Sequence, residues 1–187
     1  MGHKLGSIRV FVAIFAILLA MPTLANAQQV AESAAWRQFN INGNTVSINS
    51  EGNPDGKRSY EVLAENDGLA VARLSVNRNG VLSDAWKADL DGNGAPEIIV
   101  AVGQLDGSNQ GSVDVHEWDG YKFISKRLPQ AIPSEKGAYF GHDQFKLENG
   151  QLIREFPRFK DESDGQIPSG EKARYRFDMQ VFGWAPQ

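Results

Sequence analysis

Residues 89–97, which read DLDGNGAPE, carry oxygen-bearing side chains at alternate positions. Asp89, Asp91, Asn93 and Glu97 occupy positions 1, 3, 5 and 9 of this stretch, and Gly94 occupies position 6. Alternate oxygens on a tight turn can converge on one hard cation, and calcium takes about six to eight oxygen ligands. A glycine allows the sharp bend that brings such ligands together. The spacing therefore predicts a structural calcium site formed by Asp89, Asp91, Asn93 and Glu97.

A second interpretation of the same residues needs no ion. Asp and Asn side chains accept hydrogen bonds from nearby backbone N–H groups in tight turns. One of the four candidate ligands, Asn93, carries no charge. The sequence leaves both the calcium site and the ion-free turn open.

A loop of small, polar residues follows the apolar run 97–102 (EIIVAV). It reads GQLDGSNQGS over residues 103–112, and Asp106 is its only charged residue. Hydroxyl and amide groups on such a loop can enter a cleft lined by carboxylates, because they donate hydrogen bonds without bulk. An ordinary solvent-exposed hairpin loop would have the same composition. The candidate binding residues are Ser108, Asn109, Gln110, Gly111 and Ser112.

Sequence motifs of catalysis are missing from the chain. It contains no G-x-S-x-G, H-E-x-x-H or P-loop pattern, which would mark a nucleophile, a zinc site or a phosphate site. His116 and His142 lack the spacing of transition-metal ligands. We expect His142-Asp143 to act instead as a side-chain cap that holds the preceding loop onto the sheet. No pair of acids is marked out for glycoside chemistry by its setting, so we expect a protein that is not an enzyme; a hydrolase is the third hypothesis.

The elements that must position these residues are short strands separated by turn residues. Residues 42–44 (NGN), 119–120 (DG) and 149–150 (NG) predict hairpin turns, since Asn, Asp and Gly accept a positive φ. The run 97–102 is nearly all Ile, Val and Ala, which predicts a strand buried on both faces at the centre of a sheet. This strand would join the calcium candidate to the polar loop.

Further strands are predicted on both sides of this central run. The prolines and the glycine of residues 128–140 predict a loop there. Successive antiparallel hairpins predict an all-β fold, either an antiparallel β-sandwich or a flattened barrel. The other expected strands are 36–41, 45–48, 59–64, 70–76, 83–89, 111–118, 121–127, 144–148 and 151–156, and one long closing strand at 172–184.

The first 27 residues have the pattern of a cleavable export signal. Lys4 and Arg9 precede an apolar run over residues 10–21, and Ala-Asn-Ala follows at residues 25–27. The run is shorter than the roughly 18 to 20 apolar residues that span a bilayer. The alternative is a retained membrane anchor. We expect cleavage after Ala27, with residues 28–187 forming a single domain that is free in the periplasm.

Composition restricts the classes of partner. The chain has no cysteine, so it forms no disulfide, thiolate metal site or lipid-modified cysteine. Loss of Lys4 and Arg9 reduces the 19 basic residues to 17 against 23 acids, a net charge of −6. Negative charge disfavours nucleic acid and anionic membranes and speeds association with a basic protein. The sequence does not set the oligomeric state and leaves a homodimer open.

Four segments, in their order along the chain, resemble one protein family. They are DLDGNGAPEIIV (89–100), the Gly-Ser loop (107–112), GAYFGHDQFKLENGQLIREFP (137–157) and PSG (168–170) before a basic strand. Together they resemble the periplasmic inhibitors of invertebrate-type lysozyme. The resemblance implies a β-sandwich-like protein that blocks a lysozyme by inserting a Ser/Gly-rich loop into its active-site cleft. It implies no catalysis.

The inserting loop departs from the family pattern at one point. Related inhibitors carry a Ser-Gly-x-x-Tyr-like element, whereas residues 107–112 read GSNQGS without a tyrosine. The resemblance places inserting hydroxyl groups at Ser108 and Ser112. The amide groups of Asn109 or Gln110 could replace the missing tyrosine hydroxyl. Alternatively, the target enzyme could differ from that of the family. The leading hypothesis is a periplasmic lysozyme inhibitor. The alternative is a calcium-binding β module that recognises an envelope ligand.

Overall fold

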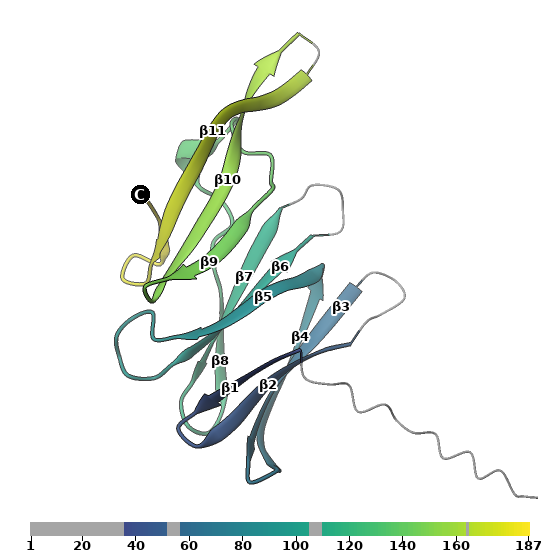
Figure 1. Ribbon diagram of the computed structural model, residues 1–187, viewed down its shortest axis with the longest axis vertical. Coiled ribbons are helices and arrows are strands. Elements are labelled where there is room, and N and C mark those ends of the chain that lie inside the picture. Colours follow the sequence, from purple (N-terminus) through teal and green to yellow (C-terminus); the bar gives the residue numbers. More distant parts are fainter. Residues whose placement is uncertain (1–35, 52–56, 105–109, 164) are drawn as a thin grey trace, which may run out of the picture. The chain divides into compact units, whose positions relative to one another are not determined.

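The computed structural model describes residues 36–51, 57–104, 110–163 and 165–187 (Figure 1). The predicted export signal, its cleavage point and the loop residues Ser108 and Asn109 lie outside the described residues. The described chain is all-β, as predicted, and consists of three four-stranded antiparallel sheets. None of its helical segments has the length and apolar character needed to cross a membrane.

Each sheet is built from consecutive strands, and each strand pairs with its neighbour in the sequence. The first sheet contains β1 (Arg37–Ile41), β2 (Asn44–Glu51), β3 (Lys57–Asn66) and β4 (Leu69–Asn79). The second contains β5 (Val81–Ala88), β6 (Glu97–Gly103), β7 (Gly111–Trp118) and β8 (Phe123–Arg127). A 3₁₀ helix η1 (Pro133–Glu135) lies in the connection to the third sheet, which contains β9 (Gln144–Glu148), β10 (Gln151–Glu162), β11 (Gly165–Asp178) and β12 (Gly183–Pro186).

Two of the predicted hairpin turns have the backbone geometry that their residues favour. Asn42 and Gly43 have φ of 49° and 82°, and Asn149 and Gly150 have φ of 49° and 76°. Two successive residues with positive φ form the turn whose twist matches that of paired strands. Local turn chemistry therefore fixes the registers of β1 with β2 and of β9 with β10.

The second sheet packs against the first on one face and against the third on the other. Ile98, Val100 and Val102 of β6 share a hydrophobic core with residues of β1–β4. Ile99 and Ala101 share another core with residues of β9–β12. Because successive side chains of a strand point to opposite faces, β6 is buried on both sides. This confirms the predicted central strand, and the sheets form stacked layers, as in a sandwich, rather than closing on themselves.

A buried polar network joins the first sheet to the second. The Tyr60 hydroxyl donates a hydrogen bond of 2.9 Å to Asp114 and lies 2.7 Å from His116 Nε2. Arg78 donates from Nε and Nη2 to the two Asp114 oxygens, each at 2.6 Å. Burial lowers the pKa of His116 to about 4, which keeps its ring neutral at pH 7. The network gives hydrogen-bond partners to Asp114 and His116, two polar side chains that β7 turns toward the first sheet.

The prediction of one closing strand over residues 172–184 is wrong. β11 ends at Asp178, and the chain reverses so that β12 pairs with β11, with Phe177 opposite Trp184. The Asp178 carboxylate accepts a hydrogen bond of 2.9 Å from the Gln180 amide, and Phe182 has a φ of 48°. Residues 179–182 contain no Gly or Pro, so the pattern carried no turn signal there.

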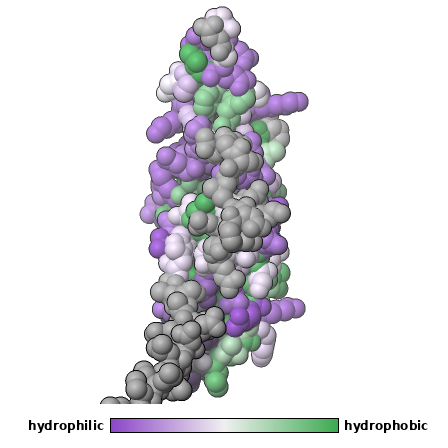
Figure 2. All heavy atoms as spheres, turned by 90° about the vertical axis from the view of Figure 1, so that its right-hand side faces the viewer, coloured by the Kyte–Doolittle hydropathy of each residue, from purple (hydrophilic) through white to green (hydrophobic). Residues whose placement is uncertain are grey.

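Hydrophobic side chains on the face shown in Figure 2 are scattered among hydrophilic ones. Single exposed apolar residues are ordinary on a soluble protein and mark no partner by themselves. The large exposed hydrophobic residues of the described chain come from several hairpins and are Leu69, Val71, Tyr121, Ile124, Ile167, Val181 and Phe182.

Candidate functional site

The predicted binding loop connects β6 to β7 at one end of the second sheet. The Gln104 amide donates a hydrogen bond of 2.9 Å to the Gln110 carbonyl, which closes the base of the loop. Gly103 and Gly111 are the last opposed pair of the β6–β7 ladder. The structure therefore fixes both points at which the loop leaves the sheet, while residues 105–109 lie outside its description.

Gly111 and Ser112, which were predicted as binding residues, are the first two residues of β7. Both are buried, and Ser112 is 7% exposed. In this position they hold the end of the loop in the sheet rather than presenting side chains to solvent.

The carboxylate of Asp143, the residue just before β9, holds the end of the loop. Its Oδ2 accepts hydrogen bonds of 2.6 Å from the Gly111 amide and 2.5 Å from the Tyr139 hydroxyl. Its Oδ1 accepts a hydrogen bond of 2.7 Å from Arg154 Nε. The side chains of Asp143 and Arg154 are 0% and 1% exposed, so this is a buried ion pair whose charges have further hydrogen bonds. Through Tyr139, Asp143 also holds the preceding loop, as predicted for His142-Asp143, whereas its contact with Gly111 was not predicted.

Arg154 is itself held by aromatic rings and by backbone. Its Nη1 donates a hydrogen bond of 2.6 Å to the Gln130 carbonyl, and its Nη2 donates one of 3.0 Å to the Tyr139 hydroxyl. Cation–π contacts add to the positioning of a buried guanidinium. The Arg154 Cζ lies 5.1–5.8 Å from the ring centres of Tyr139, Phe145, Phe156 and Trp184.

Two hollows lie beside the base of the loop and share His142 and Gln144. The hollow next to the loop has a volume of about 330 Å³ and is lined by Gly103, Gln104, His142, Asp143 and Gln144. The other has a volume of about 290 Å³, and it includes Phe156, Pro157, Phe159 and Pro168 in its lining. The second hollow therefore places apolar surface beside the hollow at the loop base.

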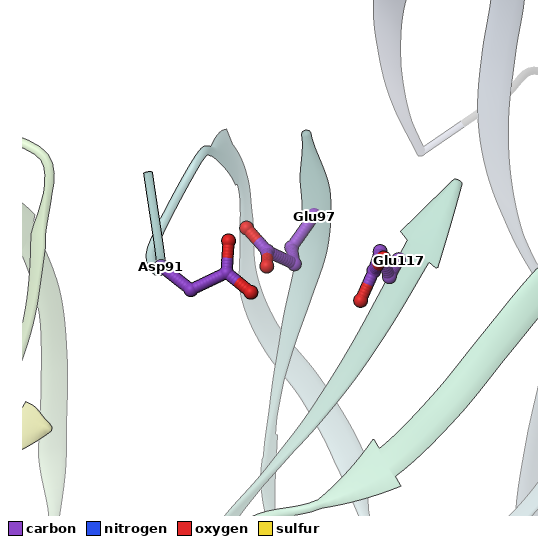
Figure 3. Close-up of side chains that lie close together, drawn as sticks. All are labelled: Asp91, Glu97 and Glu117. Carbon is purple, nitrogen blue, oxygen red and sulfur yellow. The ribbon is translucent and has the colours of Figure 1, made fainter. Parts of the chain in front are cut away.

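Three acidic side chains meet at the opposite end of β6 (Figure 3). Asp91 of the β5–β6 loop, Glu97 of β6 and Glu117 of β7 each offer one oxygen, and these oxygens lie within 4.8 Å of one another. Glu97 is fully buried, Glu117 is half-buried and Asp91 is exposed. Burial raises the pKa of Glu97, and the negative charge of Asp91 raises it further, against the hydrogen bond from the Leu90 amide. An all-oxygen group of this kind suits a hard cation.

No family model, curated protein or solved structure matches this chain. The likeness to inhibitors of invertebrate-type lysozyme therefore stays a hypothesis from short segments.

Of the three acids among the predicted calcium ligands, the structure brings Asp91 and Glu97 into the acidic cluster and leaves Asp89 outside it. The Asp89 carboxylate accepts hydrogen bonds of 3.1 and 2.9 Å from the amides of Asn93 and Gly94. The Asn93 side-chain oxygen accepts one of 2.6 Å from the amide two residues later. Asp89 and Asn93 therefore make the contacts of the turn that needs no ion.

Glu117 is the member of the acidic cluster that sequence reasoning missed. It joins the cluster because it is directly opposite Glu97 in the β6–β7 ladder. The residue of β6 that lies opposite Glu117 depends on where β7 begins after the loop. A shift of one residue in the β6–β7 register would turn the Glu117 side chain to the other face of the sheet. The sequence pattern did not fix that register.

Proposed function

We propose that this protein is an exported, non-catalytic inhibitor of a lysozyme, and that the loop between β6 and β7 enters the active-site cleft of the enzyme. The fixed base of the loop is the observation that carries the proposal. The base is closed by the hydrogen bond from Gln104 to Gln110, and Asp143 holds the Gly111 end. A loop with fixed ends loses less conformational entropy on binding than one without such support.

The chemistry of the loop suits a cleft that contains carboxyl groups. A lysozyme cleft has one protonated and one ionised carboxyl group that act on the glycosidic bond. The Ser108 hydroxyl and the Asn109 and Gln110 amides are of the types that hydrogen-bond to both forms. Inhibition of this kind requires no catalytic residue. The negative net charge of the chain favours encounter with a basic enzyme.

A lysozyme inhibition panel tests the proposal. The purified protein is added to invertebrate-type lysozyme and to other animal and bacterial classes, and lysis of a cell-wall suspension is followed by turbidity. We expect inhibition of at least one class, with the invertebrate type most sensitive. Failure to slow any class at micromolar excess would contradict the proposal.

Loop variants test the assigned contact. The triple variant Ser108→Ala, Asn109→Ala, Gln110→Ala should raise the inhibition constant at least about tenfold, which corresponds to about 1.4 kcal/mol of binding free energy. Gln180→Ala in the β11–β12 turn is the matched control, and it should leave inhibition unchanged. Equal inhibition by the triple variant and the control would assign the contact to another part of the molecule.

The acidic cluster favours a second candidate function, a calcium-dependent β module that binds an envelope ligand. That function predicts binding to isolated cell-wall sacculi that requires calcium and is lost with chelator. It also predicts no inhibition in the lysozyme panel, so one preparation distinguishes the two functions.

Export to the periplasm is part of the proposal. It is supported by the basic residues, the apolar run and the small residues over positions 1–27. N-terminal sequencing of the protein recovered from a periplasmic extract should give Gln28 as the first residue. An intact Met1 terminus in the membrane fraction would support the retained anchor instead.

A further inference from the structure

We propose that Asp91, Glu97 and Glu117 form a binding site for a hard divalent cation of the calcium type. The site is separate from the proposed inhibitory contact, since it lies at the end of β6 away from the β6–β7 loop. Its acidic ligands also differ from those predicted by sequence spacing, because Glu117 enters the set and Asp89 lies outside it.

Strand pairing forces two of the three acids together. Glu97 and Glu117 are directly opposite each other in the β6–β7 ladder, and like charges in such a pair destabilise a sheet. Asp91 adds a third carboxylate, and Figure 3 shows its carboxyl group and that of Glu97 turned toward each other. Three negative groups within 4.8 Å repel one another unless a positive charge lies among them.

An unpartnered buried oxygen is the independent sign of a ligand. Glu97 is 0% exposed, and its Oε2 accepts a hydrogen bond of 2.7 Å from the Leu90 amide. Its Oε1 is buried and has no hydrogen-bond partner in the part of the chain that the structure describes. Such a group costs free energy unless something else satisfies it. A cation between Glu97 and Asp91 would supply the missing partner.

The lysine that pairs with Glu117 does not fill this role. Lys126 Nζ lies 3.5 Å from Glu117 Oε2, and its side chain is 39% exposed. Among the side chains that the structure describes, no Lys or Arg forms an ion pair with Asp91 or Glu97. The Asp91 oxygens accept hydrogen bonds of 3.1 Å from the amide and side chain of Asn93, which is neutral. Among the described side chains, one lysine therefore pairs with a cluster of three carboxylates.

The type of ligand atom indicates which class of cation the site would bind. All three ligands are carboxylates, which favour calcium, magnesium and manganese over the softer metals that select His or Cys. Calcium accepts irregular geometry and about six to eight oxygens, so three protein ligands and several waters can complete its shell. The exposed side of the cluster, at Asp91, offers room for those waters. The other way to satisfy Glu97 is a proton on its carboxyl group, and the test separates the two.

The test measures thermal stability and heat of binding on the purified protein after treatment with EDTA. Titration calorimetry with CaCl₂ should give one site per chain, with MgCl₂ as the second arm. At about a hundredfold excess over the dissociation constant, calcium should raise the melting temperature by about 5 to 10 °C. Glu97→Gln keeps the size of the side chain and removes its charge, so it should abolish the increase.

Asp91→Asn is the second ligand variant, because this exposed residue can be changed without altering the core. It should weaken calcium binding at least tenfold. Glu171→Gln is the matched control: it changes the net charge equally at a site where the side chain is 70% exposed, and it should keep the full increase in melting temperature.

Equal melting curves of the wild type with calcium and with chelator would overturn the proposal in favour of a protonated Glu97. Retention of the increase by Glu97→Gln would overturn it as well. Neither result depends on lysozyme inhibition.

Discussion

The Gly111 amide donates a hydrogen bond of 2.6 Å to the Asp143 carboxylate, which joins the first residue of β7 to the segment that enters β9. The same carboxylate forms the buried ion pair with Arg154. One side chain thus connects the base of the β6–β7 loop to the packing between the second and third sheets. A change at Asp143 should therefore affect both stability and any function of the loop.

Asp143→Asn should lower the free energy of unfolding by about 3–5 kcal/mol, because it leaves the Arg154 guanidinium buried without its counter-charge. Urea denaturation at pH 7 measures the change. Asp84→Asn is the control, since Asp84 pairs with Arg37 where both side chains are more than 40% exposed. That control should cost about 1 kcal/mol or less. Equal costs for the two variants would mean that the buried pair does not carry the stability assigned to it.

Gly111→Ala should destabilise the protein by about 1–3 kcal/mol through overpacking. A Cβ at this position would lie 2.5 Å from Phe145 Cε2 and 2.8 Å from Asp143 Cβ. Gly103, the residue opposite in the ladder, is the matched control, because a Cβ there would meet nothing within 4 Å. Thermal unfolding of the two alanine variants compares them directly. The steric explanation fails if Gly103→Ala is as destabilising as Gly111→Ala.

The sequence predicts this fold where a few neighbouring residues decide the structure. The turns at 42–43 and 149–150 and the apolar run 97–102 each carry their signal locally, and each prediction is confirmed. The reversal at 179–182 carries no such signal. The polar residues of β7 alternate with valines, yet both faces of β7 are buried, because Tyr60 and Arg78 of the first sheet meet the polar face. Tyr60 and Arg78 reach β7 because the two sheets pack together, and this packing cannot be predicted from the residues near β7 in the sequence.

The sites were predictable to a smaller extent, for the same reason. Asp91 and Glu97 lie in one short stretch and could be proposed together, whereas Glu117 joins them only through the register of β7. The support of the loop by Asp143 and Arg154 depends on the third sheet lying against the second. Contacts between segments far apart in the sequence follow from packing rather than from residue spacing.

Tyr60→Phe should lower the free energy of unfolding by about 1–3 kcal/mol, because it removes the hydroxyl that contacts His116 Nε2 and leaves that buried nitrogen without a partner. The Asp114 carboxylate keeps its two hydrogen bonds from Arg78, which limits the cost. Tyr121→Phe is the control, since Tyr121 is 86% exposed. Urea denaturation of both variants provides the measurement. A loss no larger than that of the control would contradict the structural role of the network.

Glu135 should give the protein an acid-dependent contribution to stability. Its carboxylate accepts hydrogen bonds of 2.9 and 2.6 Å from Arg158 and one of 2.6 Å from the Tyr175 hydroxyl. The Arg158 guanidinium holds the pKa of Glu135 below its ordinary value, and the Tyr175 hydrogen bond acts in the same direction, against the effect of burial. Because the folded pKa is the lower one, the contribution is full above the unfolded value of about 4.3 and is lost as the pH falls through the folded pKa.

Glu135→Gln should therefore cost about 1–3 kcal/mol of unfolding free energy at pH 7, where charged hydrogen bonds are lost. The difference from the wild type should shrink as the pH falls below about 4.3, since protonation removes the same charge from the wild type. Urea denaturation between pH 7 and pH 3 follows both curves. Glu162→Gln, in an exposed pair with Lys160, is the control and should run parallel to the wild type throughout. A constant gap between wild type and Glu135→Gln down to pH 3 would show that the effect of the substitution is steric, because only an effect of the carboxylate charge disappears on protonation.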